Sequence, residues 1–503
     1  MNVHAITHRI QSRFPRLAVI SALMFTSFLA SLDQTILSTS LPVIAGDLGG
    51  LQDLSWVIVA YTVAMTLGMP LYGKLGDQFG HKILFCSGIA IFVLGSGLSA
   101  LAQTMDFLIF GRFIQGFGAA GIVILSQAIL ADITTVRERA KYAGLLGMVF
   151  GVSSIGGPFL GGFLTETFSW HWNFWINVPL GIAALLVILR QVKLPHQIQS
   201  RKVDYAGIVL MSIAVTSLTL VASWAGTRYD WISPQILVTL AVFVLSTAGF
   251  IWVEAKTAEP IIPLGFFKNR TFAICTVAGV TVGAGIFGVT SYLPTYFQVV
   301  QDASVIASGM LVLPMLTALF IGTVVSGWII SKTGHYRVFP PLGLGLSALG
   351  LYLMSMMTVE TSLTMTIVYT VIFGLGLGFS AQNIIFIVQN AMPAKVIGAA
   401  TASTNFFREI GVSLGIALFG AVFASRILAG NVATELTPDA IHAMSGPERT
   451  ETVGIYAEAL TSGFFWLVPF LVVGFIVSLF IPSIELSSDT GMERRSKEAL
   501  SGS

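Results

Sequence analysis

The chain has 503 residues, of which 55% are hydrophobic and only 10% are charged, whereas a soluble domain carries roughly 25% charged residues. A formal net charge of +2 is too small to indicate nucleic-acid binding, and no basic run is interleaved with aromatic residues. This composition excludes an ordinary soluble protein and predicts an all-α membrane protein.

Fourteen apolar segments follow one another along the chain, each near the length of about 20 residues that a helix needs to cross a bilayer. They lie at about 17–42, 54–73, 83–103, 107–131, 141–165, 173–190, 206–225, 235–254, 272–297, 306–330, 340–358, 362–386, 402–425 and 461–481. The first continues to Pro42 without an obvious cleavage site, so we interpret it as a span and not as a signal peptide. The longest polar interruption, about 429–460, predicts an aqueous loop.

Lysine and arginine fall mainly on one side of these segments. With a cytoplasmic N-terminus, most of the 26 basic residues are cytoplasmic. The exceptions are Arg228, Arg426 and Arg449 outside, and Arg112 and Arg408 within segments. The positive-inside rule therefore predicts that both termini, including a tail at 486–503, are cytoplasmic. We expect a multi-pass protein of the cytoplasmic (inner) membrane.

An internal repeat predicts two halves. "GKLGDQFGHK" (73–82) and "GWIISKTGHY" (327–336) both place glycine at the first and eighth positions and histidine at the ninth. Parallel repeats of six-helix halves, with the substrate site between them, are a common plan of secondary transporters. The expected parts are a six-helix bundle in 1–200, two additional linker helices in 201–260 and a second six-helix bundle in 261–485.

The first apolar segment contains an acid, Asp33, within "FTSFLASLDQTIL" (25–37). A charged carboxylate near mid-bilayer costs about 2.5–3.5 kcal/mol, so it is a functional hypothesis by default. Arg112 lies at a comparable depth in the fourth segment and is the candidate partner. Burial favours the neutral acid and a guanidinium favours the carboxylate, so conformation could control protonation. The alternative is a permanent ion pair that only fixes helix register.

The fifth segment has glycines at four-residue spacing and an internal proline. Gly147 and Gly151, then Gly157 and Gly161, lie on common helix faces where helices can pack closely, and Pro158 kinks the helix. This pattern favours either a rocking joint or plain helix packing.

"STNFFREIGVSLGIAL" (403–418) brings Arg408 and Glu409 into the start of the thirteenth segment, close to its cytoplasmic end. Adjacent residues point in different directions on a helix, so these two need not pair. The two side chains could take part in proton coupling, or they could extend to the membrane interface so that their charges stay in water.

The short turn after the second segment contains Gly73, Leu75, Asp77, Gly80 and Lys82. It resembles the loop signature of the major facilitator superfamily, Gly-x-Leu-x-Asp-Arg-x-Gly-Arg-Lys. Gln78 and His81 stand where the signature has arginine. The resemblance implies a gating loop formed by Gly73, Asp77, Gly80 and Lys82.

Further stretches resemble the fourteen-spanner drug:proton antiporter family of that superfamily. They are "LDQTILSTSLP" (32–42), "GRFIQGFGAAG" (111–121) with Arg112 and Gln115, "GMVFGVSSIGGPFLGG" (147–162) and "WHWNFWINVPLG" (170–181), where His171 replaces arginine. The resemblance implies the major facilitator fold with fourteen spans, and an acid at Asp33 that acts in cation recognition and proton coupling. Tyr61 is one of several aromatic residues on segments expected to approach a central cavity, where an aromatic face suits lipophilic cations. A position at the membrane interface or facing lipid is the alternative for any one of them.

The resulting functional prediction is proton-coupled export of lipophilic, cationic drugs or toxic compounds by alternating access. Transport of another cargo, such as a metabolite, siderophore or lipid, and uptake are the alternatives. All seven histidines fall in predicted loops or tails, and no phosphate-binding loop is present, so we do not expect an enzyme. The expected partners are a lipophilic small molecule, protons and the lipid bilayer, without nucleic acid, cofactor or metal, and the expected state is a monomer.

Overall fold

A computed structural model describes residues 13–48, 54–191, 204–226, 228–430, 441, 443–487 and 489–501. Within these ranges the chain is helical and contains no strand, and its only β-type pairs are two isolated bridges. Every apolar segment predicted above contains a helix. The all-α prediction is therefore confirmed.

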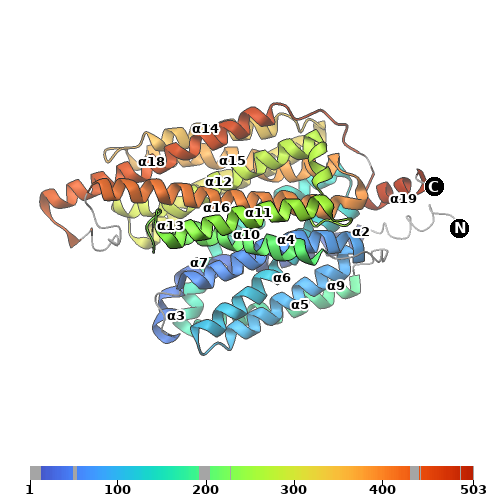
Figure 1. Cartoon of the computed structure of the whole chain (residues 1–503), viewed down its shortest axis with the longest axis horizontal. Coiled ribbons are helices and arrows are strands. Elements are labelled where there is room, and N and C mark those ends of the chain that lie inside the picture. Colours follow the sequence, from blue (N-terminus) through green and yellow to red (C-terminus); the bar gives the residue numbers. More distant parts are fainter. Residues whose placement is uncertain are drawn as a thin grey trace.

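The first helices pack into one group, coloured blue to cyan in Figure 1. Its members are α2 (Arg13–Ile36), η1 (Leu37–Thr39), α3 (Leu41–Leu48), α4 (Leu54–Phe79), α5 (His81–Ala100), α6 (Met105–Ile133), α7 (Val136–Thr167), α8 (Trp172–Trp175) and α9 (Asn177–Gln191). Buried Phe85, Phe92 and Leu125 belong to its apolar core. We call this set the N-terminal group.

The later helices pack into a second group, coloured yellow to red in Figure 1. Its members are η3 (Leu264–Lys268), α12 (Arg270–Val299), α13 (Val305–Thr333), α14 (Phe339–Ser355), α15 (Leu363–Ala391), η4 (Ala394–Val396), α16 (Ile397–Ala429) and α18 (Gly446–Ser478). Phe373, Phe419 and Phe464 are fully buried in its core. We call this set the C-terminal group.

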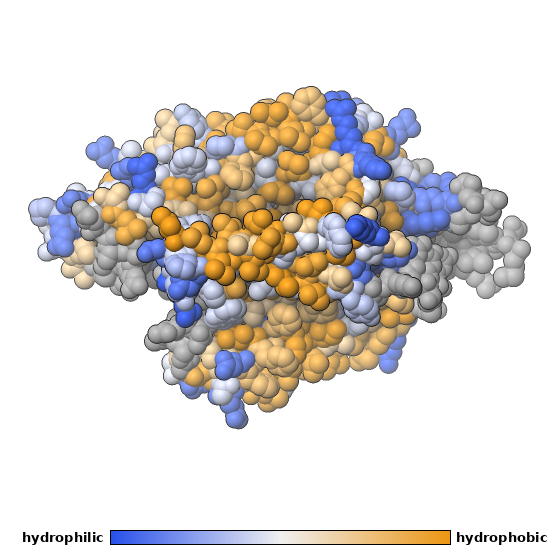
Figure 2. Space-filling model, viewed as in Figure 1, coloured by the Kyte–Doolittle hydropathy of each residue, from blue (hydrophilic) through white to orange (hydrophobic). Residues whose placement is uncertain are grey.

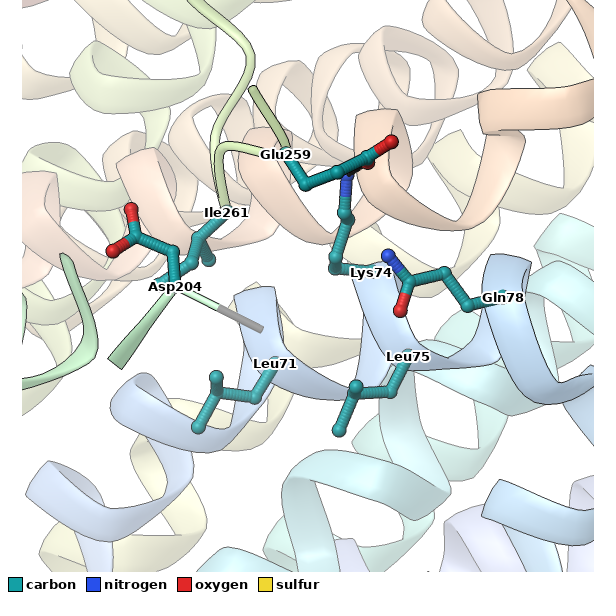
Figure 3. A pocket seen from close by; sticks show the side chains of 7 residues that line it. All are labelled: Leu71, Lys74, Leu75, Gln78, Asp204, Glu259 and Ile261. Carbon is teal, nitrogen blue, oxygen red and sulfur yellow. Dashed lines mark hydrogen bonds and ion pairs between the residues drawn. The ribbon is translucent and has the colours of Figure 1, made fainter. Parts of the chain in front are cut away.

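Two green helices, α10 (Tyr205–Trp224) and α11 (Pro234–Lys256), connect the groups. They pack on each other, and α10 also contacts α4 and α16. Figure 3 shows where the segment after α11 meets α4: Lys74 Nζ lies 2.6 Å from Glu259 Oε2, next to the buried amide of Gln78. This ion pair fastens the connecting helices to the N-terminal group.

Within the described ranges, twelve helices are long and apolar enough to cross a membrane. Helices α7 and α14 lie outside that count, and α14 has 17 residues. Figure 2 shows hydrophobic residues around the middle of the molecule and hydrophilic residues gathered at its two ends. The distribution is that of a multi-pass membrane protein.

The structure corrects the polar loop expected at 429–460. Helix α16 continues to Ala429 and α18 begins at Gly446, so the acidic stretch after Gly446 is helical. Residues 431–440 and 442 lie outside the described part. For residues 446–460 the prediction of a loop was wrong, because a long apolar helix can carry charged residues in its first turns.

The tail expected from residue 486 onward also contains a helix, α19 (Gly491–Ser501). It lies at the same end of the molecule as the start of α2, as Figure 1 shows. We call this end the terminal end.

The two groups meet along α4 with α16 and α7 with α13. At the terminal end the groups approach closely at Gly73, where a β-carbon would clash with the Ala402 methyl group and the Gly398 carbonyl. Only glycine permits this contact, which explains the first position of the loop motif.

Candidate functional site

Asp33 lies on α2 in the interior of the N-terminal group and has no solvent-exposed surface. Its Oδ2 accepts a hydrogen bond of 2.6 Å from Arg112 Nη1 on α6. Arg112 is itself 2% exposed. The structure therefore joins the acid and the base that the sequence placed at similar depths.

Two amides complete the surroundings of the carboxylate. Gln115 Nε2 and Asn177 Nδ2 each donate to Asp33 Oδ1 at 2.7 Å, and both amides also donate to Ser96 Oγ. Gln115 Oε1 accepts from Arg112 Nη1 at 2.7 Å. The donors Arg112 Nη1, Gln115 Nε2 and Asn177 Nδ2 thus each have an acceptor, as a stable buried polar network requires.

Sequence reasoning missed Asn177. It lies at the start of α9, inside the "INVPLG" stretch that carried part of the family resemblance. An asparagine at the start of an apolar helix can simply cap that helix. The sequence pattern therefore did not indicate that Asn177 contacts Asp33.

Two aromatic rings cover the guanidinium. The Arg112 Cζ atom lies 4.1 Å from the centre of the Tyr61 ring and 5.9 Å from that of Phe174. The Tyr61 hydroxyl donates to the Ala30 carbonyl at 3.3 Å, which holds the ring in place. The predicted residues Asp33, Arg112, Gln115 and Tyr61 thus form one cluster, called the Asp33 cluster below, together with Asn177.

The glycine-rich helix α7 packs directly on the helix that carries Asp33. A β-carbon at Gly157 would clash with the Thr35 side chain, and one at Gly161 with the Ile36 carbonyl. Thr39 Oγ1 donates to the Pro158 carbonyl at 3.2 Å. The second half of the glycine pattern therefore lets α7 touch α2 one turn beyond Asp33.

The first half of that pattern behaves differently. A β-carbon at Gly151 would meet nothing within 4 Å, so Gly151 is not a packing glycine in this conformation, contrary to the sequence-based expectation. The surroundings of Gly147 lie outside the described part.

At the terminal end, Asp77 caps a helix of the other group. Its Oδ1 accepts from Gly398 N at 3.1 Å and its Oδ2 from Ala399 N at 2.7 Å. These amides belong to the first turn of α16, where free N–H groups and the helix dipole attract an anion. The carboxylate therefore joins the two groups.

His81 replaces arginine in the loop signature yet keeps an ionic link. Its Nε2 lies 3.0 Å from Asp77 Oδ1 and its Nδ1 lies 2.6 Å from Asp132 Oδ2. Because carboxylates only accept, two short contacts of this kind fit a ring with both nitrogens protonated. Gln78, the other replacement, is buried with neither amide atom hydrogen-bonded among the described residues.

Two further loop residues have local roles. Gly80 caps α5 at φ 94°, a conformation that favours glycine. Lys82 Nζ donates to the Leu189 carbonyl at the end of α9, at 3.0 Å. Asp77 carries the contact between the groups, and these two residues shape the turn.

Arg408 and Glu409 differ from the sequence-based expectation in their place along the helix, and their pairing, which the sequence left open, is present. Arg408 Nη2 contacts Glu409 Oε1 at 3.4 Å, so the adjacent residues do pair. Because α16 begins at Ile397, Arg408 lies roughly 17 Å along the helix and not at its end. Both side chains are partly exposed and neither joins the Asp33 cluster.

Comparisons with known proteins agree with this architecture. The model of the Major Facilitator Superfamily matches residues 23–416. An uncharacterised MFS-type transporter of Mycobacterium tuberculosis is 36% identical over 479 residues, covering 93% of this chain and 70% of the relative. The multidrug transporter protein MdtP of Bacillus subtilis is 31% identical and covers 96% of both chains. Multidrug resistance protein 3 of the same organism is 33% identical, with 85% of this chain and 82% of the relative covered.

A solved structure supports the fold alone. The human organic anion transporter MFSD10 superposes with a TM-score of 0.64 at 15% identity, covering 93% of this chain and 100% of the other. Together with the family match over most of the chain and relatives named multidrug transporters, this confirms the resemblance seen in the motifs. The chain belongs to the Major Facilitator Superfamily.

Proposed function

We propose that this protein is a proton-coupled secondary exporter of lipophilic, cationic compounds in the cytoplasmic membrane, working by alternating access as a monomer. In this proposal the chain crosses the membrane fourteen times, α7 and α14 included, with the terminal end in the cytoplasm. The two groups are halves formed from 1–200 and 261–485, joined by two linker helices in 201–260. The observation that carries the proposal is the enclosed Asp33 cluster in a chain whose relatives are named multidrug transporters.

The proposed chemistry uses the competition between a proton and Arg112 for the same carboxylate. In the conformation described here Asp33 Oδ2 accepts a hydrogen bond from Arg112 Nη1 at 2.6 Å. A proton binding to that oxygen removes the acceptor, and the guanidinium must then turn to another partner. Gln115 Oε1 already lies 2.7 Å from Arg112 Nη1 and can keep that contact.

Access to the cluster sets the order of events. Asp33 has no solvent-exposed surface, so a proton reaches its carboxyl group only after the surrounding side chains move. A conformational change shifts protonation only as far as the two states differ in proton affinity. Each charge that crosses 100 mV contributes about 2.3 kcal/mol to the cycle.

Ethidium transport in proteoliposomes under an imposed pH gradient tests the proposal. We expect the parent protein to move ethidium against its gradient when protons flow the other way, and Asp33→Asn to lose this proton-driven movement. Asp106→Asn is the matched control, since Asp106 is an exposed acid in the first turn of α6. Unchanged pH-dependent transport by Asp33→Asn would refute the assigned role. Competition by a metabolite, siderophore or lipid, or net uptake, would favour the alternative cargo or direction.

A further inference from the structure

The C-terminal helix α19 has no role in the function proposed above, yet it is firmly held. Thr490 and Glu493 form a reciprocal cap at its start: Thr490 N donates to Glu493 Oε2 at 2.8 Å and Glu493 N donates to Thr490 Oγ1 at 3.3 Å. A helix of 11 residues is marginal by itself in water. Contacts with the rest of the protein must therefore hold it in place.

The segment before α19 is attached to the C-terminal group. The Tyr336 hydroxyl donates to the Pro482 carbonyl at 3.1 Å and accepts from Ile484 N at 2.6 Å. Ser487 N donates to Asn390 Oδ1 at 3.5 Å. The chain thus reaches α19 along the surface of the C-terminal group.

Side chains of α19 then bind the connection between α15 and α16. Arg494 Nη2 donates to the Met392 carbonyl and Arg495 Nε to the Ala394 carbonyl, both at 2.9 Å. Ala394 N donates to Glu498 Oε1 at 3.0 Å. These charge-assisted bonds to backbone groups fix α19 on the C-terminal group.

The same helix also contacts the N-terminal group. Arg495 Nη2 lies 3.2 Å from Asp132 Oδ1 and 3.7 Å from Asp77 Oδ1. Gly491 packs so closely on α6 that a β-carbon would lie 2.7 Å from the Ala131 carbonyl. The bridge between Thr135 and Thr490 adds a backbone contact. One guanidinium, that of Arg495, therefore binds both groups at once.

We propose that α19 is a releasable clasp that holds the cytoplasmic mouth of the carrier closed. Because α19 is attached to the C-terminal group, separating the groups at the terminal end must break its contacts with Asp132, Asp77 and Ala131. The buried carboxylates Asp132 and Asp77 would each lose a cation in that step, which opposes opening. The clasp rests on the proposed alternating access, and it adds a control on the rate and extent of inward opening.

Distance measurement between spin labels tests the clasp without any transport assay. Labels at Arg190→Cys on the N-terminal group and His335→Cys on the C-terminal group use exposed positions, in full-length protein in nanodiscs with both native cysteines replaced by alanine. We expect Arg495→Ala to raise the ratio of long to short distances roughly tenfold, because its ion pairs with Asp132 and Asp77 join a partly exposed guanidinium to enclosed carboxylates and so lie between exposed and buried pairs in strength. Lys497→Ala is the matched control, because Lys497 pairs at 2.6 Å with Asp489 of its own segment.

Two more variants keep the test decisive if Arg495→Ala folds poorly. Arg495→Glu places a like charge beside Asp132 and Asp77, so we expect a larger shift, and Arg495→Lys should restore part of the parental distribution. Distances that stay parental in both Arg495→Ala and Arg495→Glu would overturn the clasp. A carrier that opens as predicted but shows no proton dependence would fail the proposed function and leave the clasp intact.

Discussion

Two buried carboxylates of the N-terminal group, Asp33 and Asp77, differ in where their partners come from. In the part of the chain that the structure describes, the donors to Asp33 belong to its own group, namely Arg112, Gln115 and Asn177. Asp77 accepts from backbone amides at the start of α16, in the other group. When the groups move as bodies, Asp33 can keep its partners and Asp77 cannot. Asp33 is therefore suited to chemistry and Asp77 to sensing the relative position of the groups.

The largest expected effect comes from isolating Asp33. Arg112→Ala leaves a carboxylate enclosed without its cation, so we expect a loss of about 3–5 kcal/mol in stability together with loss of transport. Thermal unfolding in detergent measures the first and ethidium efflux the second. Arg190→Ala is the control, since that arginine is exposed.

A double variant sharpens this test. Asp33→Asn combined with Arg112→Ala removes both charges, and we expect it to recover much of the stability but none of the proton-driven transport. Equal stability of Arg112→Ala and the parent would show that the pair is not energetically coupled.

The next largest effect is expected from disturbing the close packing of α7 on α2, beside Asp33. Gly161→Ala puts a methyl group against the Ile36 carbonyl, and we expect a cost of about 1–3 kcal/mol from overpacking. Gly151→Ala, on the same helix but with open space, should leave the unfolding temperature unchanged or raise it slightly. Equal costs for the two variants would mean that α7 does not depend on close contact with α2.

The contrasting variant at the other carboxylate is Asp77→Ala. It removes the cap of α16, and a lost helix cap costs about 0.5–2 kcal/mol, so we expect the open population at the terminal end to rise several-fold. Proton dependence of transport should survive in this variant. The label pair at Arg190 and His335 measures the shift, and a loss of proton coupling with unchanged distances would reverse the roles assigned to Asp33 and Asp77.

The smallest expected effect is at the C-terminal group. Arg408 and Glu409 pair at 3.4 Å with both side chains partly exposed, and such pairs contribute about 0.2–1 kcal/mol. Glu409→Gln should therefore change thermal stability little and leave the pH profile of transport unchanged. A displaced pH profile would show that this pair takes part in coupling.

Much of the fold was predictable because a helix in lipid satisfies its backbone by itself and needs a long apolar run. The pairing of Asp33 with Arg112 could be suggested from the sequence, because the depth of a residue in the bilayer follows from its position along its helix. The contact between Asn177 and Asp33 could not be predicted, because it depends on how α9 is rotated about its axis after the break at Ile176. Helix α19 was missed because tertiary contacts, and not its sequence pattern, hold it in place.

His81 shows how a departure from a motif can preserve its contacts. Histidine stands here where the loop signature has arginine. The ring nevertheless lies between Asp77 and Asp132 at 3.0 and 2.6 Å. Which acid faced it could not be predicted, because Asp132 lies just beyond the predicted end of its segment.

Proton release on binding tests the central claim most directly. Ethidium is added to purified protein in weakly buffered solution and a pH indicator records the protons set free. At a pH where Asp33 carries a proton, the account predicts that the bound cation displaces it, so the parent releases protons and Asp33→Asn releases none, while Asp106→Asn behaves as the parent does. Equal release by the parent and by Asp33→Asn would contradict the account, because the titrating group would then lie elsewhere.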